Sequence, residues 1–278
     1  MEKNGVNYID PTFQQFSFYP FNNVELEDIV FWPKDFLYHD TTDQLSVIGY
    51  GRNGWVETDR NGQLLLSTTL DGYKQELQIY NDIHQTKDGS IWVAGNHVSG
   101  LRADTFSRPS LLLLNRATNE LQPYESSNKK LETLQQKNIL RILEIDQELW
   151  GITENTLFTL NPITEELQLH TLDKRIHITE SFNDLIYHPS TNLLLIATEN
   201  RLVGVNIKTQ AFTNYKAINN TIVKSIVAQQ DTIWLATSSK GIKGYHLKTA
   251  ALIDLNSYNN TPKAVSYTHL TLPTKRIV

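Results

Sequence analysis

The stretch KDGSIWVAG, Lys87–Gly95, joins a turn-forming Asp-Gly pair to the apolar run Ile-Trp-Val-Ala. An Asp-Gly pair flanked by β-forming residues is typical of a tight hairpin turn. The apolar frame returns along the chain, with Leu or Val in place of Trp in two copies. Its copies begin at Val47, Trp92, Trp150, Leu195 and Trp234. A strand that recurs in this way indicates a repeat protein.

The rest of each repeat also consists of short apolar runs separated by polar turns. A run such as Ile139–Ile145 precedes the Trp-containing one, and two more follow, separated by a turn such as Asn161–Thr164. Only Asn128–Ile139 has a helical pattern. Each unit reads as four strands, A to D, over about 40 to 45 residues, the length of a β-propeller blade. The predicted fold class is all-β: an incomplete β-propeller of four-stranded antiparallel blades, with about five to six blades present and the Trp side chains between them.

Composition excludes several classes of function. The chain has 278 residues, a net charge of -5 and an isoelectric point near 5.9, whereas nucleic-acid binders carry a basic face. It has no cysteine, and its eight histidines show no metal-ligand spacing. No segment has the roughly 18 apolar residues that a membrane span needs. We therefore expect no metal, no cofactor, no nucleic-acid partner and no membrane segment in this chain.

The two ends of the chain depart from the repeat. The N-terminus, MEKNGVNYIDPTF, has no apolar region of the kind found in secretory signals, and FQQFSFYPFNNVELEDI resembles the end of a preceding blade. Val265–Val278, VSYTHLTLPTKRIV, fits no part of the repeat and is interpreted as a non-native tail derived from a sequencing adapter. We expect residues 1–264 to form a partial propeller and the chain to be a piece of a longer protein.

The repeat resembles the two-component regulator propeller repeat. The segments that carry this resemblance are KDGSIWVAG, QELWGITENTLFTLNPITEEL and DTIWLATSSKGIKGYHLKTAAL. It implies a seven-bladed parent propeller and a non-enzymatic sensor in the periplasmic part of an inner-membrane hybrid histidine kinase. It also implies that the sensor detects an oligosaccharide or similar ligand, forms a homodimer, and signals to a kinase that this chain does not contain.

Candidate ligand residues come from the loops between strands B and C, which share one face of a propeller with the D–A connections. Sugars are held by aromatic faces and by planar donors and acceptors, and Trp55 is a candidate stacking platform. The insertion Asn96–Ser110 is the leading candidate segment, because long loops are often functional. The candidate ligand-binding residues are Arg52, Asn53, Trp55, Asn96, His97, Arg102, Arg201 and Lys240.

Two other functions stay open. Asp28, Asp82 and Asp184 each precede an expected innermost strand and would point toward a central channel, where glycosidases of propeller fold place their carboxylates. The alternative function is therefore a carbohydrate-active enzyme that uses these three residues. Residues of this type before strands also cap turns. A propeller that acts as a protein-binding scaffold is the further alternative.

Overall fold

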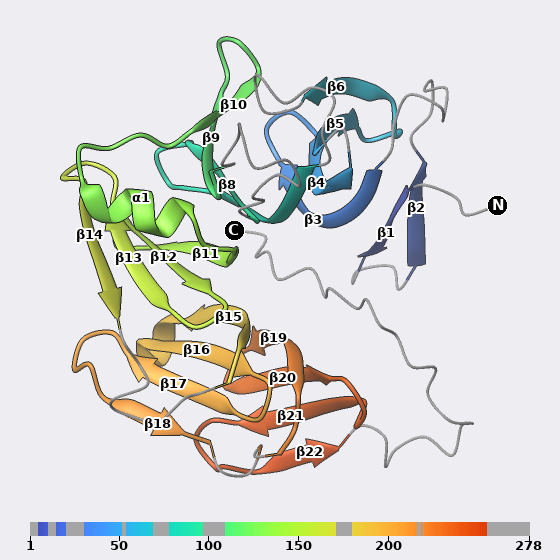
Figure 1. Cartoon of the computed structure of the whole chain (residues 1–278). Helices are drawn as coiled ribbons and strands as arrows, with labels where there is room; N and C mark the ends of the chain where they lie inside the picture. Colours follow the sequence, from blue (N-terminus) through green and yellow to red (C-terminus); the bar gives the residue numbers. More distant parts are fainter. Residues whose placement is uncertain are drawn as a thin grey trace. The chain divides into compact units, whose positions relative to one another are not determined.

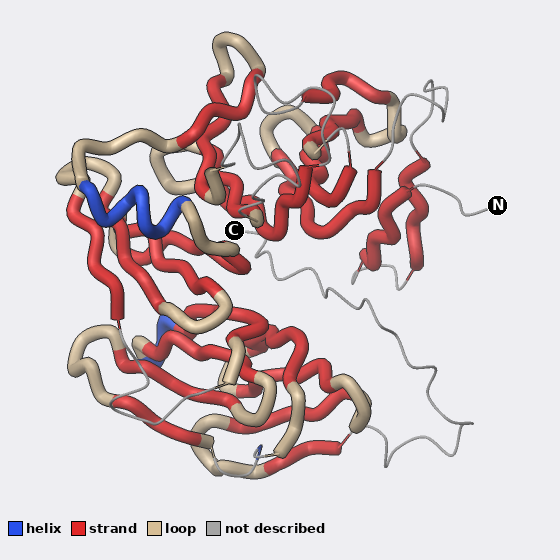
Figure 2. Tube along the Cα trace, viewed as in Figure 1, coloured by secondary structure: helices blue, strands red, loops and turns tan. Residues whose placement is uncertain are grey.

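The computed structural model describes residues 5–10, 15–20, 31–51, 54–68, 78–96, 109–170, 180–215, 218 and 220–254. The chain divides into two compact units, Met1–Ile139 and Leu140–Val278. Antiparallel strands make up nearly all of the regular secondary structure described in both units (Figures 1 and 2). The remaining elements are helix α1 (Lys129–Gln135) and the 3₁₀ turn η1 (Pro189–Thr191).

The first unit contains a hairpin and two blades. The hairpin pairs β1 (Gly5–Asp10) with β2 (Gln15–Pro20). Blade 1 consists of β3 (Phe31–His39), β4 (Gln44–Gly51), β5 (Trp55–Asp59) and β6 (Leu64–Thr68). Blade 2 consists of β7 (Gln78–Gln85), β8 (Ile91–Gly95), β9 (Leu111–Asn115) and β10 (Glu120–Pro123). The two blades also pair directly where β4 meets β7.

The second unit contains three four-stranded blades in which neighbours in sequence pair in order. Blade 3 consists of β11 (Ile139–Ile145), β12 (Glu148–Thr153), β13 (Leu157–Asn161) and β14 (Glu166–His170). Blade 4 consists of β15 (Phe182–His188), β16 (Leu193–Thr198), β17 (Leu202–Asn206) and β18 (Phe212–Asn214). Blade 5 consists of β19 (Val223–Gln229), β20 (Thr232–Thr237), β21 (Ile242–His246) and β22 (Leu252–Asp254). The predicted fold class is confirmed.

The threonine that ends the repeated frame has a specific local role. In blade 4, the Thr198 hydroxyl donates to the carbonyl of Arg201 and accepts from the backbone N–H groups of Asn200 and Arg201. Thr153 and Thr237 form the same closed turn in blades 3 and 5. A hydroxyl that satisfies backbone groups in this way holds a short loop in one shape. The repeat therefore fixes the start of each of these B–C loops.

An asparagine fixes the hairpin between strands C and D. The side-chain oxygens of Asn115, Asn161 and Asn206 each accept from the backbone N–H groups two and three residues later. The residue four positions after each asparagine has a positive φ of 55° to 57°. This combination is a type I turn followed by a left-handed residue, a common way to close a β-hairpin.

The Trp position of the repeat fills the space between blades, as the sequence predicts. Trp92 has 2% of its surface exposed, and Leu195, its counterpart in blade 4, is fully buried in a cluster with Ile226 and Leu235 of blade 5. Trp150 packs in the same way against a cluster that includes Phe182 of blade 4.

In blade 1 the sequence alignment is wrong by one residue. Ser46, not Val47, lies opposite Leu37 at the register that Trp92 occupies opposite His84 in blade 2. Ser46 is fully buried, and its hydroxyl donates to the carboxylate of Glu57 at 2.9 Å. A polar cluster therefore stands in blade 1 where the other blades have Trp or Leu.

Blade 2 completes this polar cluster. Arg116, from the β9–β10 hairpin, donates to both carboxylate oxygens of Glu57 at 3.1 Å. His39 lies 2.8 Å from the Ser46 hydroxyl through its Nε2 atom. The Glu57 side chain is only 7% exposed, so its charge is compensated by a residue from the neighbouring blade. This arrangement links blades 1 and 2.

Candidate functional site

Three of the predicted ligand residues lie within the described B–C loops and hold their own blade together. The guanidinium of Arg201 pairs with Glu180, which precedes strand A of the same blade. The ammonium of Lys240 donates to the carbonyl of Asn220 and to the hydroxyl of Thr221, both at 3.1 Å. The side-chain oxygen of Asn96 accepts from Asn81 at 2.5 Å. Arg201 and Lys240 thus anchor the segment that enters strand A, and Asn96 bonds to strand A itself.

Two opposing effects act on the pKa of Glu180, and the bonding partners outweigh burial. Burial raises the pKa of this carboxyl, but hydrogen bonds from Arg201, from its own backbone and from Asn200, together with the Arg201 charge, hold the pKa below its ordinary value. Arg201 is therefore engaged in an ion pair that stabilises the folded loop.

Trp55 does not offer the stacking face that was expected of it. Its surface is fully buried in the core cluster of the first unit, together with Ile48 and Tyr80. The exposed aromatic side chain at this edge of blade 1 is Trp32, 52% exposed, which lies directly opposite Tyr50 with ring centroids 5.3 Å apart. Sequence reasoning missed Trp32 because the expected strand A was placed earlier, at Asp28.

The remaining predicted ligand residues cannot be placed. Arg52, Asn53, His97 and Arg102 lie outside the described residues, as does Asp28. Residues 265–278 lie outside them too.

Two of the three carboxylates that were considered for catalysis, Asp82 and Asp184, occupy one recurring position. Each of four A strands has an irregularity in pairing just before the residue at this position, which is Asp35, Asp82, Asp184 or Ser225. Asp35, not Asp28, occupies this position in blade 1. Its carboxylate accepts from the backbone N–H of Ile83 in blade 2 at 3.2 Å.

Asp184 is fully buried and uses both of its oxygens to join blades. One oxygen accepts from Arg141 of blade 3 at 2.7 Å, and the other accepts from the hydroxyl of Ser225 and the backbone N–H of Ile226, both in blade 5. Asp82 is likewise buried, with 4% of its surface exposed. Asp184 thus holds blades 3, 4 and 5 together.

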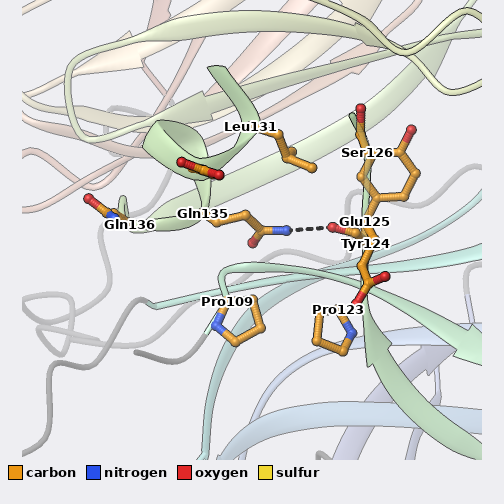
Figure 3. A pocket seen from close by; sticks show the side chains of 9 residues that line it. Pro109, Pro123, Tyr124, Glu125, Ser126, Leu131, Gln135 and Gln136 are labelled. Atoms are coloured by element: carbon orange, nitrogen blue, oxygen red, sulfur yellow. Dashed lines mark hydrogen bonds between the residues drawn. The ribbon is translucent and has the colours of Figure 1, made fainter. Parts of the chain in front are cut away.

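A cavity lies at the loop edge of the first unit, between Pro109, just before strand C of blade 2, and the D–A connection that follows this blade. Its volume is about 440 Å³, within the usual range for small-ligand sites. Pro109 is the second-last residue of the predicted insertion Asn96–Ser110, Pro123 is the last residue of β10, and the other lining residues belong to the connection that follows β10 (Figure 3). The lining residues are Pro109, Pro123, Tyr124, Glu125, Ser126, Leu131, Glu132, Gln135 and Gln136.

Helix α1 forms one wall of the cavity, and its sequence explains why it folds there. Asn128 caps the helix by accepting from the backbone N–H of Lys130, and Leu131 and Leu134 are the buried residues of the helix. The predicted helical segment Asn128–Ile139 is therefore confirmed in its first part. Seven residues make a short helix, which depends on packing for its stability.

Gln135 fastens this helix to the blade. Its side-chain oxygen accepts from the backbone N–H of Leu111 at 2.8 Å, and its amide nitrogen donates to the carbonyl of Leu111 at 3.1 Å. The same nitrogen donates to the carbonyl of Tyr124, also at 3.1 Å (Figure 3). The Tyr124 ring packs on Trp92 with centroids 4.9 Å apart. The cavity wall is therefore rigidly tied to the Trp of the opening motif.

Sequence reasoning placed ligands on this edge but selected only B–C loop residues. The lining residues of the D–A connection were missed, although the length of this connection and its helical pattern set it apart from the others. Among the described residues, no group of His, Cys, Asp or Glu side chains could hold a metal ion. None of the described helices is long and apolar enough to cross a membrane.

No protein-family model and no curated protein sequence matches the chain. Several solved structures have a similar fold. One is described as the extracellular domain of the hybrid two component system BT3049 from B. thetaiotaomicron, with a TM-score of 0.62 and 15% identity over 92% of this chain and 32% of that one. The corresponding domain of BT4673 from the same organism has a TM-score of 0.59 and 18% identity over 86% of this chain and 30% of that one. The β-propeller domain of Cps50 (Swd1) from Myceliophteria thermophila has a TM-score of 0.54 and 10% identity over 77% and 64%.

These similarities concern the fold, because all three identities are 18% or lower. The resemblance predicted from the repeat is confirmed at that level: solved structures with the same fold include extracellular domains of hybrid two-component systems. The chain spans about a third of the length of those two structures.

Proposed function

We propose that this chain is the ligand-sensing part of a two-component signalling protein, located on the extracytoplasmic side of the membrane. In this proposal it binds an oligosaccharide or a similar ligand and passes the signal to a histidine kinase outside this chain. The observation that carries the proposal is the cavity at the loop edge of blade 2, in a fold shared with extracellular sensor domains. Homodimer formation in the parent protein belongs to the same proposal.

The cavity has the mixture of surfaces that sugar recognition requires. Pro109, Pro123 and the ring of Tyr124 supply apolar surface, while Ser126 and Gln136 supply polar groups at the wall. Sugars present apolar faces and many hydroxyls, so they bind where such surfaces lie side by side. The anchoring of Gln135 on β9 keeps the wall in place before a ligand arrives, which lowers the cost of binding.

The enzyme alternative has less support. Asp184 has no exposed surface and bonds to Arg141, Ser225 and Ile226, so it is not available to a substrate in this structure. The fold neighbours BT3049 and BT4673 are described as extracellular domains of hybrid two component systems, which agrees with a chain that has no catalytic role.

Isothermal titration calorimetry of the purified chain against a panel of oligosaccharides tests this function. We expect at least one sugar to bind, and we expect Gln136→Trp to weaken that binding at least about tenfold by filling the cavity mouth. Thr133→Trp is the matched control, because Thr133 is exposed on the same helix and does not line the cavity. Uniform absence of binding to folded protein, or equal weakening by both variants, would count against the proposal.

A further inference from the structure

The charged side chains that line the cavity in the described part of the chain are both acidic. Glu125 and Glu132 line it, and no Lys, Arg or His belongs to the lining within the described ranges. Lys129 and Lys130 lie in the first turn of α1 but do not line the cavity. Neither Glu125 nor Glu132 has a hydrogen bond or an ion pair to another described residue, and both are exposed. Two carboxylates are thus available at one small site.

The other polar groups of the wall are largely used. The side-chain amide of Gln135 donates to and accepts from Leu111 and donates to Tyr124. The Ser126 hydroxyl oxygen accepts from the backbone N–H of Asn128 at 3.0 Å. An ionised carboxylate only accepts hydrogen bonds, with room for about four on its two oxygens. Gln136 adds an exposed amide that can both donate and accept. The charged groups of the described lining are the two carboxylates, which only accept, and they favour a ligand that is rich in donors.

From this geometry we propose that the cavity selects an amine-bearing, positively charged sugar over neutral and acidic sugars. The inference rests on the proposed function and specifies its ligand class. A protonated amine supplies three donors and a charge opposite to that of Glu125 and Glu132, whereas a uronic or sulfated sugar brings a like charge. The net charge of -5 on the whole chain acts in the same direction.

The expected preference is modest, because the cavity is open to water. A unit charge about 4 Å from a carboxylate in water-like surroundings changes affinity by about fivefold. Two carboxylates therefore give a preference on the order of tenfold for the amine over the neutral analogue at low ionic strength. The preference should shrink as salt is added, since the Debye length falls to about 8 Å at physiological ionic strength.

The test measures the affinities of three sugars of equal length by titration calorimetry at pH 6. They are glucosamine oligomers, in which the amine is protonated at this pH, their N-acetylated neutral counterparts, and galacturonate oligomers. We expect the affinity to fall in that order. In the double variant Glu125→Gln/Glu132→Gln, the advantage of the amine over the neutral sugar should disappear. Glu199→Gln is the control, because it removes one carboxylate charge from an exposed residue outside the lining set and should keep the order.

The outcomes separate this inference from the function on which it rests. If neutral or acidic sugars bind as tightly as the amine, or if the order survives the double variant, the ligand class is wrong while the sensing function stands. If none of the three sugars nor any other oligosaccharide binds to folded protein, both proposals are overturned.

Discussion

Arg141 donates through Nε to the carboxylate of Asp184 at 2.7 Å and so ties the innermost strand of blade 3 to that of blade 4. Arg141 takes the position in its strand that Asp82 and Asp184 take in theirs, so an arginine replaces a carboxylate in the recurring set. The second oxygen of Asp184 continues the chain of contacts to Ser225 and Ile226 of blade 5. One buried carboxylate thus joins three consecutive blades.

Replacement of Asp184 should therefore be strongly destabilising. Asp184→Ala leaves the 15% exposed Arg141 without its counterion and the backbone N–H of Ile226 without its acceptor. Breaking a buried pair in this way costs about 3 to 5 kcal/mol. Urea unfolding followed by circular dichroism measures the loss, with Glu199→Ala in the exposed B–C loop of blade 4 as the reference. A loss no greater than that of the reference would show that the blades do not depend on this contact.

Removal of the Arg116 guanidinium from the polar cluster of blade 1 should lower the free energy of unfolding. Arg116→Ala leaves the carboxylate of Glu57 paired only with Ser46 and His39, at a site where 7% of the side chain is exposed. We expect a loss of about 1 to 3 kcal/mol in unfolding free energy, the usual penalty for an uncompensated buried polar group. Glu57→Gln in the same background should recover part of that loss because it removes the charge. Additive losses in the double variant would contradict a direct Arg116–Glu57 interaction.

The fold could be predicted from the sequence because each repeat carries the same turn residues as well as the same strands. Thr198 and Asn206 are visible in the sequence at fixed offsets, and they form the turns that their positions indicate. The sequence alignment of the repeat was wrong at one point, in blade 1. Ser46 replaces the Trp, so the frame slipped to Val47, and a slip of one residue moves every side chain to the other face of the sheet.

The site was less predictable because its residues are defined by contacts between distant parts of the chain. Arg201 and Lys240 have the composition of ligand residues, but their partners Glu180 and Thr221 lie about twenty residues earlier in the sequence. Trp55 begins a strand, and the direction of its side chain depends on the pleat of a sheet that composition does not fix. Helix α1 creates a cavity only because Gln135 fastens it to β9.

Gly49 marks a place where two strands approach too closely for any side chain. A Cβ at this position would lie 2.0 Å from the backbone carbonyl oxygen of Trp32, whereas one at Gly244 would lie 2.9 Å from the side chain of Trp234. A side chain can turn away, but backbone must move with its strand. Gly49→Ala should therefore cost about 1 to 3 kcal/mol and Gly244→Ala clearly less, as measured by thermal or urea unfolding. Equal losses of stability in the two variants would mean that the backbone of β3 can move as easily as the side chain of Trp234.

Acid should remove the stabilisation that Glu180 and Arg201 provide. Burial raises the pKa of Glu180, but the hydrogen bonds and the charge of Arg201 outweigh it and leave the pKa below its ordinary value of about 4.3. A carboxyl whose pKa is lowered by folding adds stability above its unfolded pKa and loses it as the pH falls through the folded value. Arg201→Gln should therefore be less stable than the parent at pH 7, and the difference should shrink below about pH 4.

Lys240→Gln is the matched control, since Lys240 bonds to the uncharged Asn220 carbonyl and Thr221 hydroxyl. The stability that this variant loses should not change as the pH falls through the same range. A difference for Arg201→Gln that stays constant down to pH 2 would show that Arg201 acts through packing and not through the charge of Glu180.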